Sequence, residues 1–235
     1  MGVADESAYV GAYWGPRAEP VETCAGRLHA YLTRLATLHP QLGQWHTTVD
    51  SPSEDAPPIQ LDEDTLRAFL LRGRNRTDDG GQVIEELGYS QSLWNGREDD
   101  WEVGTTVTCG VTSSSLPNAV VFDPPFPTPA NTELFRPLMI RGVIEAVVEA
   151  WAPQRAKFIT NSLDEMQDGL PTPQVGWLTY VSAEIPGEPA PAGAVVRRFG
   201  DGHLIEIGDD PFAVDPAAAQ RVREWLGVGI PRLPE

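Results

Sequence analysis

The chain has 235 residues, 41% hydrophobic and 22% charged, a composition typical of a soluble globular protein. Its 34 acidic and 17 basic residues give a formal charge of −17 at pH 7. A field of this sign repels nucleic acid and attracts a basic partner, although acidity also serves solubility alone. The acids are spread along the chain, so we expect them on a folded surface.

Several classes of site and location are excluded by what the sequence lacks. Lys157 is the only lysine, so no Gly-Lys-Ser/Thr phosphate loop exists. Cys24 and Cys109 make no Cys-x-x-Cys motif and fall on apolar faces, which predicts small core residues. The N-terminus has no signal-peptide pattern, and no apolar run reaches the length of a membrane span. We therefore expect a cytoplasmic protein with no membrane partner.

The first half of the chain alternates strand and helix patterns. Residues 9–14 read as a strand, and a helix follows from about Pro20, with apolar residues three and four apart up to Leu38. A short helix is predicted over 62–72, with acids in its first turn, and a strand over 89–94. The segment 83–87 is too short to assign to helix or strand by periodicity.

The second half continues with strands over 105–112 and 119–122 and a helix that ends at Trp151 and begins between residues 133 and 137. Four further strands are predicted over 158–160, 176–182, 194–199 and 203–207, and a last helix begins at Asp215-Pro216. This order predicts an α+β fold with a mostly antiparallel sheet packed with two long helices and a C-terminal helix. We expect one domain over 1–235, with 1–7 and 228–235 frayed.

No motif in the sequence points to catalysis, a cofactor or a metal. The four histidines have no metal-binding spacing, and neither a nucleophile elbow nor a dinucleotide-binding glycine motif is present. Adjacent acids such as Asp209 and Asp210 diverge in a strand or turn. The sequence therefore predicts no catalytic, cofactor or metal site. The alternative is a small hydrolase that uses carboxylate and histidine residues from separate loops, with His46 or His203 in a deep pocket.

The segment 93–101 is the best candidate for a partner-binding surface. An apolar strand ends there in an Asn-Gly turn, and three consecutive acids lie between two tryptophans, a combination suited to protein recognition. The alternative is a polar turn whose tryptophans face the core. Of the other tryptophans, Trp151, Trp177 and Trp225 lie in core-patterned elements. Trp45 and Trp101 lie in polar loops and are the better interface candidates, and Trp94 fits either role.

A series of short motifs, each weakly specific alone, occurs between residues 9 and 182: Tyr9–Arg17, Glu22–Leu28, Arg74–Arg76, Gly80–Ser90, Leu93–Arg97, Asn118–Val121 and Val175–Ser182. In order and spacing the series is similar to the immunity protein 52 family. The resemblance implies a bacterial antitoxin that binds and blocks a cognate polymorphic toxin, here a nuclease of restriction-endonuclease-like fold, by stoichiometric binding and without catalysis.

An acidic inhibitor of this kind can occupy the positive groove that a nuclease presents to phosphate, or it can act at a distance from that groove. The predicted partner-binding residues are these: Asp78, Asp79, Trp94, Glu98, Asp99, Asp100 and Trp101. The predicted partner is a basic toxin domain, with no direct contact to nucleic acid. The oligomeric state stays open, and a structural subunit of a secretion assembly is a third possibility.

Overall fold

The computed structural model describes residues 6–47, 57–167, 173–185, 187 and 189–227. Its contacts divide the chain into two compact units. Of the described residues, unit 1 comprises those up to Ala12 and those from Pro124 onward, and unit 2 comprises those within Tyr13–Asp123. Each unit pairs strands with helices, and the structure thus confirms the α+β class. The single domain over 1–235 stays a prediction, and the frayed ends lie outside the described residues except for Glu6 and Ser7.

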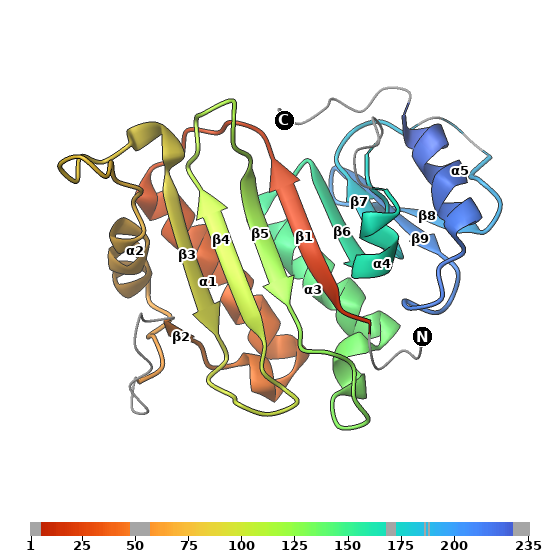
Figure 1. Cartoon of the computed structure of the whole chain (residues 1–235), viewed down its shortest axis with the longest axis horizontal. Helices are drawn as coiled ribbons and strands as arrows, with labels where there is room; N and C mark the ends of the chain where they lie inside the picture. The colour runs from red at the N-terminus through yellow and green to blue at the C-terminus, as the bar shows by residue number, and fades with distance from the viewer. Residues whose placement is uncertain (1–5, 48–56, 168–172, 186, 188, 228–235) are drawn as a thin grey trace. The chain divides into compact units, whose positions relative to one another are not determined.

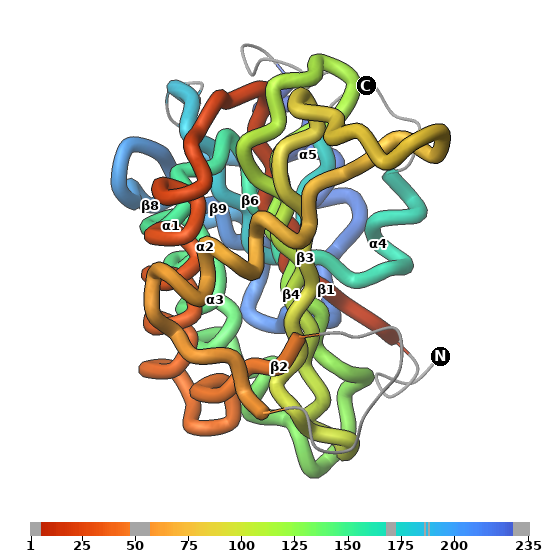
Figure 2. Tube along the Cα trace, turned by 90° about the vertical axis from the view of Figure 1, so that its left-hand side faces the viewer, coloured from red at the N-terminus to blue at the C-terminus, as the bar shows by residue number. Residues whose placement is uncertain are grey.

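In unit 2, two helices cover one face of a four-stranded antiparallel sheet (Figures 1 and 2). The strands lie in the order β2-β3-β4-β5. The elements are α1 (Val21–Leu38), α2 (Glu63–Arg72), β2 (His46–Thr47), β3 (Tyr89–Trp94), β4 (Gly104–Cys109) and β5 (Asn118–Asp123). Two 3-10 turns, η2 (Pro40–Leu42) and η3 (Glu85–Leu87), precede β2 and β3.

The apolar periodicity of the sequence explains the core of unit 2. The residues of α1 that recur at three and four positions are fully buried, including Leu28, Tyr31 and Leu35. They pack on the inward-facing side chains of the strands, where Tyr31 Oη lies 3.3 Å from Thr105 Oγ1. Burial raises the pKa of Tyr31 well above its usual value. Cys24 and Cys109 are buried free thiols, as the sequence predicts.

Trp45 corrects one expectation from the sequence. It was predicted to be an interface residue because it lies in a polar stretch, but its side chain is 0% exposed. The 3-10 turn η2 directs the chain so that the Trp45 indole packs inward and its Nε1 donates to the carbonyl oxygen of Leu42 at 3.0 Å. Because the indole N–H has an acceptor inside the core, burying the tryptophan leaves no unsatisfied donor on its ring.

Unit 1 is built on five strands in the order β1-β6-β7-β9-β8. The pairs β6–β7, β7–β9 and β8–β9 are antiparallel. The strands are β1 (Ala8–Trp14, through Ala12), β6 (Arg155–Thr160), β7 (Leu178–Val181), β8 (Ala194–Phe199) and β9 (Gly202–Ile207). The other elements are η4 (Thr132–Phe135), α3 (Pro137–Trp151), α4 (Asn161–Glu165) and α5 (Pro216–Leu226).

Both faces of this sheet are covered by helices (Figures 1 and 2). Helix α3 lies on one face, where Arg141 makes a bidentate ion pair with Glu206 of β9. Helices α4 and α5 lie on the other face, where Val222 and Leu226 pack with Ile205 and Ile207. The predicted N-cap of α5 is confirmed, since Asp215 accepts a hydrogen bond from the backbone N–H of Ala217.

Candidate partner-binding surface

The loop of residues 95–103, which joins β3 to β4, carries most of the predicted binding residues, and the buried side chain of Asn95 shapes it. The Asn95 amide donates to the carbonyl oxygen of Trp101 at 2.7 Å and to that of Gln41 at 3.3 Å. Its Oδ1 accepts from the backbone N–H of Val103 at 3.0 Å. Gly96 has a φ of 73°, which confirms the turn predicted from the Asn-Gly pair. The loop is thus closed on itself and tied to η2.

The charges of this loop are mostly negative and mostly exposed. Glu98, Asp99 and Asp100 are exposed, and so is Glu102. Asp99 accepts two hydrogen bonds from the guanidinium of Arg97, which lower the pKa of its carboxyl, and a third from the backbone N–H of Trp101. Because Arg97 offsets one of the four acids, the loop presents a net negative surface.

The two tryptophans that flank the acids differ in their surroundings. Trp101 is half-buried and stacks on His39, with ring centroids 4.4 Å apart and an angle of 17° between the planes. Trp94 is also half-buried and lies at the end of β3, where its ring contacts His46 at a centroid distance of 5.8 Å. Each ring is held by a histidine on one side, so neither tryptophan is a freely exposed anchor.

Asp78 and Asp79 lie apart from the other predicted residues. They are exposed in the loop that precedes β3, whereas the 95–103 loop follows β3 (Figure 1). The two groups therefore lie at opposite ends of a six-residue strand. At a rise of about 3.3 Å per residue, roughly 20 Å separates the ends of such a strand. The structure brings Trp94, Glu98, Asp99, Asp100 and Trp101 together and leaves Asp78 and Asp79 outside this group.

Between these two ends lies a sheet face that no described helix of unit 2 covers. It faces the reader in Figure 1, whereas α1 lies behind the strands. The cross-strand row Leu93–Thr105–Phe122 points to the helices and is at most 3% exposed. The next row points the other way and is half-buried or exposed: His46, Trp94, Gly104 and Asp123.

Hydroxyl groups make up much of the rest of this open face. Ser92 Oγ lies 2.9 Å from Thr106 Oγ1, and Ser90 Oγ lies 3.1 Å from Thr108 Oγ1 across the β3–β4 pair. On β5 the same face carries Ala119 and Val121. The sequence identified Trp94 but not its row partners, because the register of four strands depends on loops that periodicity does not describe.

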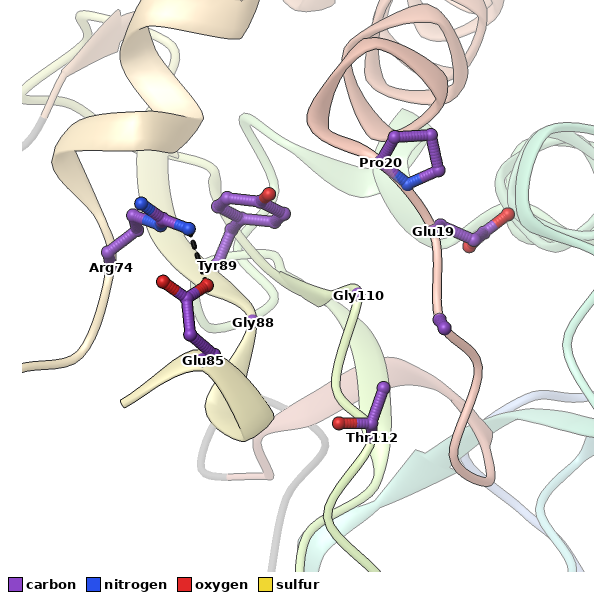
Figure 3. A pocket seen from close by; sticks show the side chains of 9 residues that line it. Glu19, Pro20, Arg74, Glu85, Gly88, Tyr89, Gly110 and Thr112 are labelled. Atoms are coloured by element: carbon purple, nitrogen blue, oxygen red, sulfur yellow. Dashed lines mark hydrogen bonds and ion pairs between the residues drawn. The ribbon is translucent and has the colours of Figure 1, made fainter. Parts of the chain in front are cut away.

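A cavity of about 310 Å³ lies at the other end of β3, beside the start of α1 (Figure 3). Its acids are already paired. Arg74 Nη2 lies 2.6 Å from a carboxylate oxygen of Glu85, and the carboxylate of Glu19 accepts from the guanidinium groups of Arg17 and Arg27. None of the predicted binding residues lines this cavity.

The histidines required by the hydrolase alternative do not line a described cavity with an acid. The 310 Å³ cavity has no histidine in its lining, and neither does a cavity of about 280 Å³ beside the start of α5. His46 lies on the open sheet face beside Trp94, and the ring of His203 lies on β9 with its Nδ1 buried. Neither of these two cavities favours this alternative.

Among the described helices, none has the length and apolar character needed to cross a membrane.

Comparisons with known proteins place the chain in a family. Among the solved structures that are similar is that of the Pseudomonas aeruginosa T6SS protein PA0821, at 14% sequence identity and a TM-score of 0.49, with 94% of this chain and 72% of that chain covered. A search of curated proteins finds no match. The model of the family described as Immunity protein 52 matches residues 6–227, and the chain therefore belongs to this family.

Proposed function

We propose that this chain binds a cognate polymorphic toxin domain in a stoichiometric complex and neutralises it without catalysing a reaction. We further propose that the toxin is a basic, nuclease-like domain and that the complex forms in the bacterial cytoplasm. Membership of the Immunity protein 52 family, over residues 6–227, is the observation that carries this proposal. The formal charge of −17 supports a basic partner, since complementary charge steers association.

The 95–103 loop is the part of the predicted site that the geometry supports best as a contact surface. Its acids are exposed, and the buried side chain of Asn95 fixes its shape, so little order has to be gained on binding. Co-expression tests the function directly. Cells that make the toxin encoded beside this gene should survive only when this chain is also made. Equal killing with and without the chain would refute the proposal.

Reversing the loop charges should slow complex formation. We expect Glu98→Lys together with Asp100→Lys to lower the association rate with the toxin domain about tenfold at low salt, because a basic partner would no longer be steered to this loop. Asp99 is left in place since it bonds to Arg97 and to the backbone of Trp101. The rate should be measured by stopped-flow fluorescence at two salt concentrations, and the difference should shrink at high salt.

The matched control reverses the same number of charges at the other end of β3, by Asp78→Lys together with Asp79→Lys. If the 95–103 loop forms the contact, the control variant should associate nearly as fast as the wild type. An equal slowing by both pairs would show that only total charge matters. An unchanged rate for the loop variant would remove the loop from the site.

A further inference from the structure

We propose that the space over Gly104, between Trp94 and Asp123 in their cross-strand row, takes a lysine or arginine side chain of the toxin domain. We call this space the Gly104 gap. The inference rests on the proposed function and adds to it the chemistry of one contact. Three features of the row support it: a glycine that the backbone does not need, a carboxylate without a cationic partner, and a tryptophan on the opposite side of the glycine.

Gly104 is not required by the fold. Its backbone is not in the left-handed region, and a Cβ built there would meet its nearest neighbours at 3.8–4.0 Å, which is ordinary van der Waals contact. Glycine in a strand weakens it and often marks a close approach by a ligand or another chain. By contrast, a Cβ at Gly88 would overlap the backbone of Cys109, and Gly88 has a φ of 58°. The glycine therefore leaves empty a position that has room for a Cβ.

Asp123 lies on the far side of the gap with its charge uncompensated. Among the residues that the structure describes, its carboxylate forms no ion pair and accepts no side-chain hydrogen bond. The side chain is exposed, although neighbouring atoms desolvate the carboxyl enough to raise its pKa. A cation delivered into the gap would supply a counter-charge that the described residues do not.

Trp94 lies on the opposite side of Gly104 from Asp123. In the row it is the direct partner of Gly104, and Gly104 is the direct partner of Asp123. Strands lie about 4.8 Å apart, so the backbones of Trp94 and Asp123 are roughly 10 Å apart across the glycine. An indole ring attracts a cation over roughly 6 Å, a range that suits a cation held between these two residues. His46 contacts the Trp94 ring from β2, on the side of the row away from the gap.

The surroundings of the gap favour the same occupant. The rest of the open face is neutral, with the hydroxyl pairs Ser92–Thr106 and Ser90–Thr108. The acidic 95–103 loop leads directly into β4, whose first residue is Gly104. Among the described strand residues of this face, Asp123 alone is charged, so a basic protein surface laid on the strands would find its complementary charge at the gap.

Filling the gap tests the proposal. Gly104→Val adds a β-branched side chain that suits a strand, so the variant should melt at or above the wild-type temperature. We expect it to weaken the affinity for the purified toxin domain at least about tenfold, and Asp123→Asn to do so by a similar factor, because the cation loses its space or its counter-charge. Isothermal titration calorimetry measures both, and size-exclusion chromatography with light scattering gives the oligomeric state of each free variant.

Ala119→Val is the matched control. It places the same valine side chain on the same open face, but four residues before Asp123 on β5, and it should leave the affinity unchanged. An unchanged affinity of Gly104→Val, or an equal loss of affinity in Ala119→Val, would overturn the proposal that the Gly104 gap takes a cation. Either result would leave the proposed function intact. A wild-type dimer that Gly104→Val dissociates would also overturn it, since the occupant would then be a second copy. Absence of binding by the wild type would instead refute the proposed function.

Discussion

Replacing Gly176 with alanine is expected to destabilise unit 1 by about 3 kcal/mol, because the new methyl group would overlap a neighbouring strand. A Cβ built at Gly176 collides with the carbonyl oxygen of Phe158 and lies 2.6 Å from its carbonyl carbon. Both atoms belong to the backbone of β6, so no side chain can move aside. The backbone N–H of Gly176 also donates to Thr179 Oγ1 at 3.0 Å, which fixes the start of β7.

Thermal unfolding followed by circular dichroism measures this effect, and a loss of this size lowers Tm by roughly 6–12 °C. Gly187→Ala is the control, because no atom of the described residues lies within 4 Å of its Cβ position. That substitution should leave stability within about 1 kcal/mol of wild type, since it only restricts the unfolded chain. If the Gly176 variant melts like the control, the close approach of β6 to Gly176 is wrong.

Asp164→Ala is expected to cost about 3 kcal/mol, since it leaves the only lysine of the chain buried without its counter-ion. Lys157 Nζ donates to Asp164 Oδ1 at 2.8 Å, and the lysine side chain is 7% exposed. Gln174 accepts a second hydrogen bond from the same ammonium group. Burial lowers the pKa of Lys157 even with Asp164 in place, which shows that desolvation outweighs the pairing. Tyr9 would lose its acceptor as well, because its hydroxyl donates to Asp164 Oδ2 at 2.7 Å.

Urea unfolding measures the loss, and the double variant Lys157→Met/Asp164→Ala identifies its cause. If the unpaired ammonium is responsible, removing it should restore most of the stability that Asp164→Ala costs. Asp64→Ala serves as the exposed comparison, because Asp64 pairs with Arg67 at 3.6 Å while 92% exposed, and it should change stability by less than about 0.5 kcal/mol. A double variant as unstable as the single one would contradict this account.

The elements with strong periodicity or clear caps were predicted well from the sequence. The apolar stripe of α1, the Asp215-Pro216 start of α5 and the glycine turn between β8 and β9 all appear where they were expected. Boundaries were less accurate. The strand expected to reach Thr112 ends at Cys109, because Gly110 has a φ of 70° and turns the chain. The five-residue helix α4 was missed, since it is too short to show a period.

The candidate site was predictable only in part. An aromatic and acidic turn is visible in the sequence, and the structure keeps Trp94 and the loop acids together. The partners of Trp94 are not visible there. Gly104 reads as the edge of a strand and Asp123 as the start of a proline turn, and only the strand register places them beside the tryptophan. The prediction that Trp45 is an interface residue was wrong for a related reason. A tryptophan in a polar segment can be buried when a backbone carbonyl accepts a hydrogen bond from its N–H, as that of Leu42 does here.

The side chain of Asn95 has a consequence for how long a complex would last. Two of its hydrogen bonds close the 95–103 loop before any partner arrives, and a third ties the loop to Gln41. A loop that is already ordered loses little conformational entropy when it docks, so less of the contact energy is spent on ordering it. Differences in affinity between related complexes arise mainly from differences in the dissociation rate. An Asn95→Ala loop would still attract its partner through the same charges, yet it would release that partner sooner.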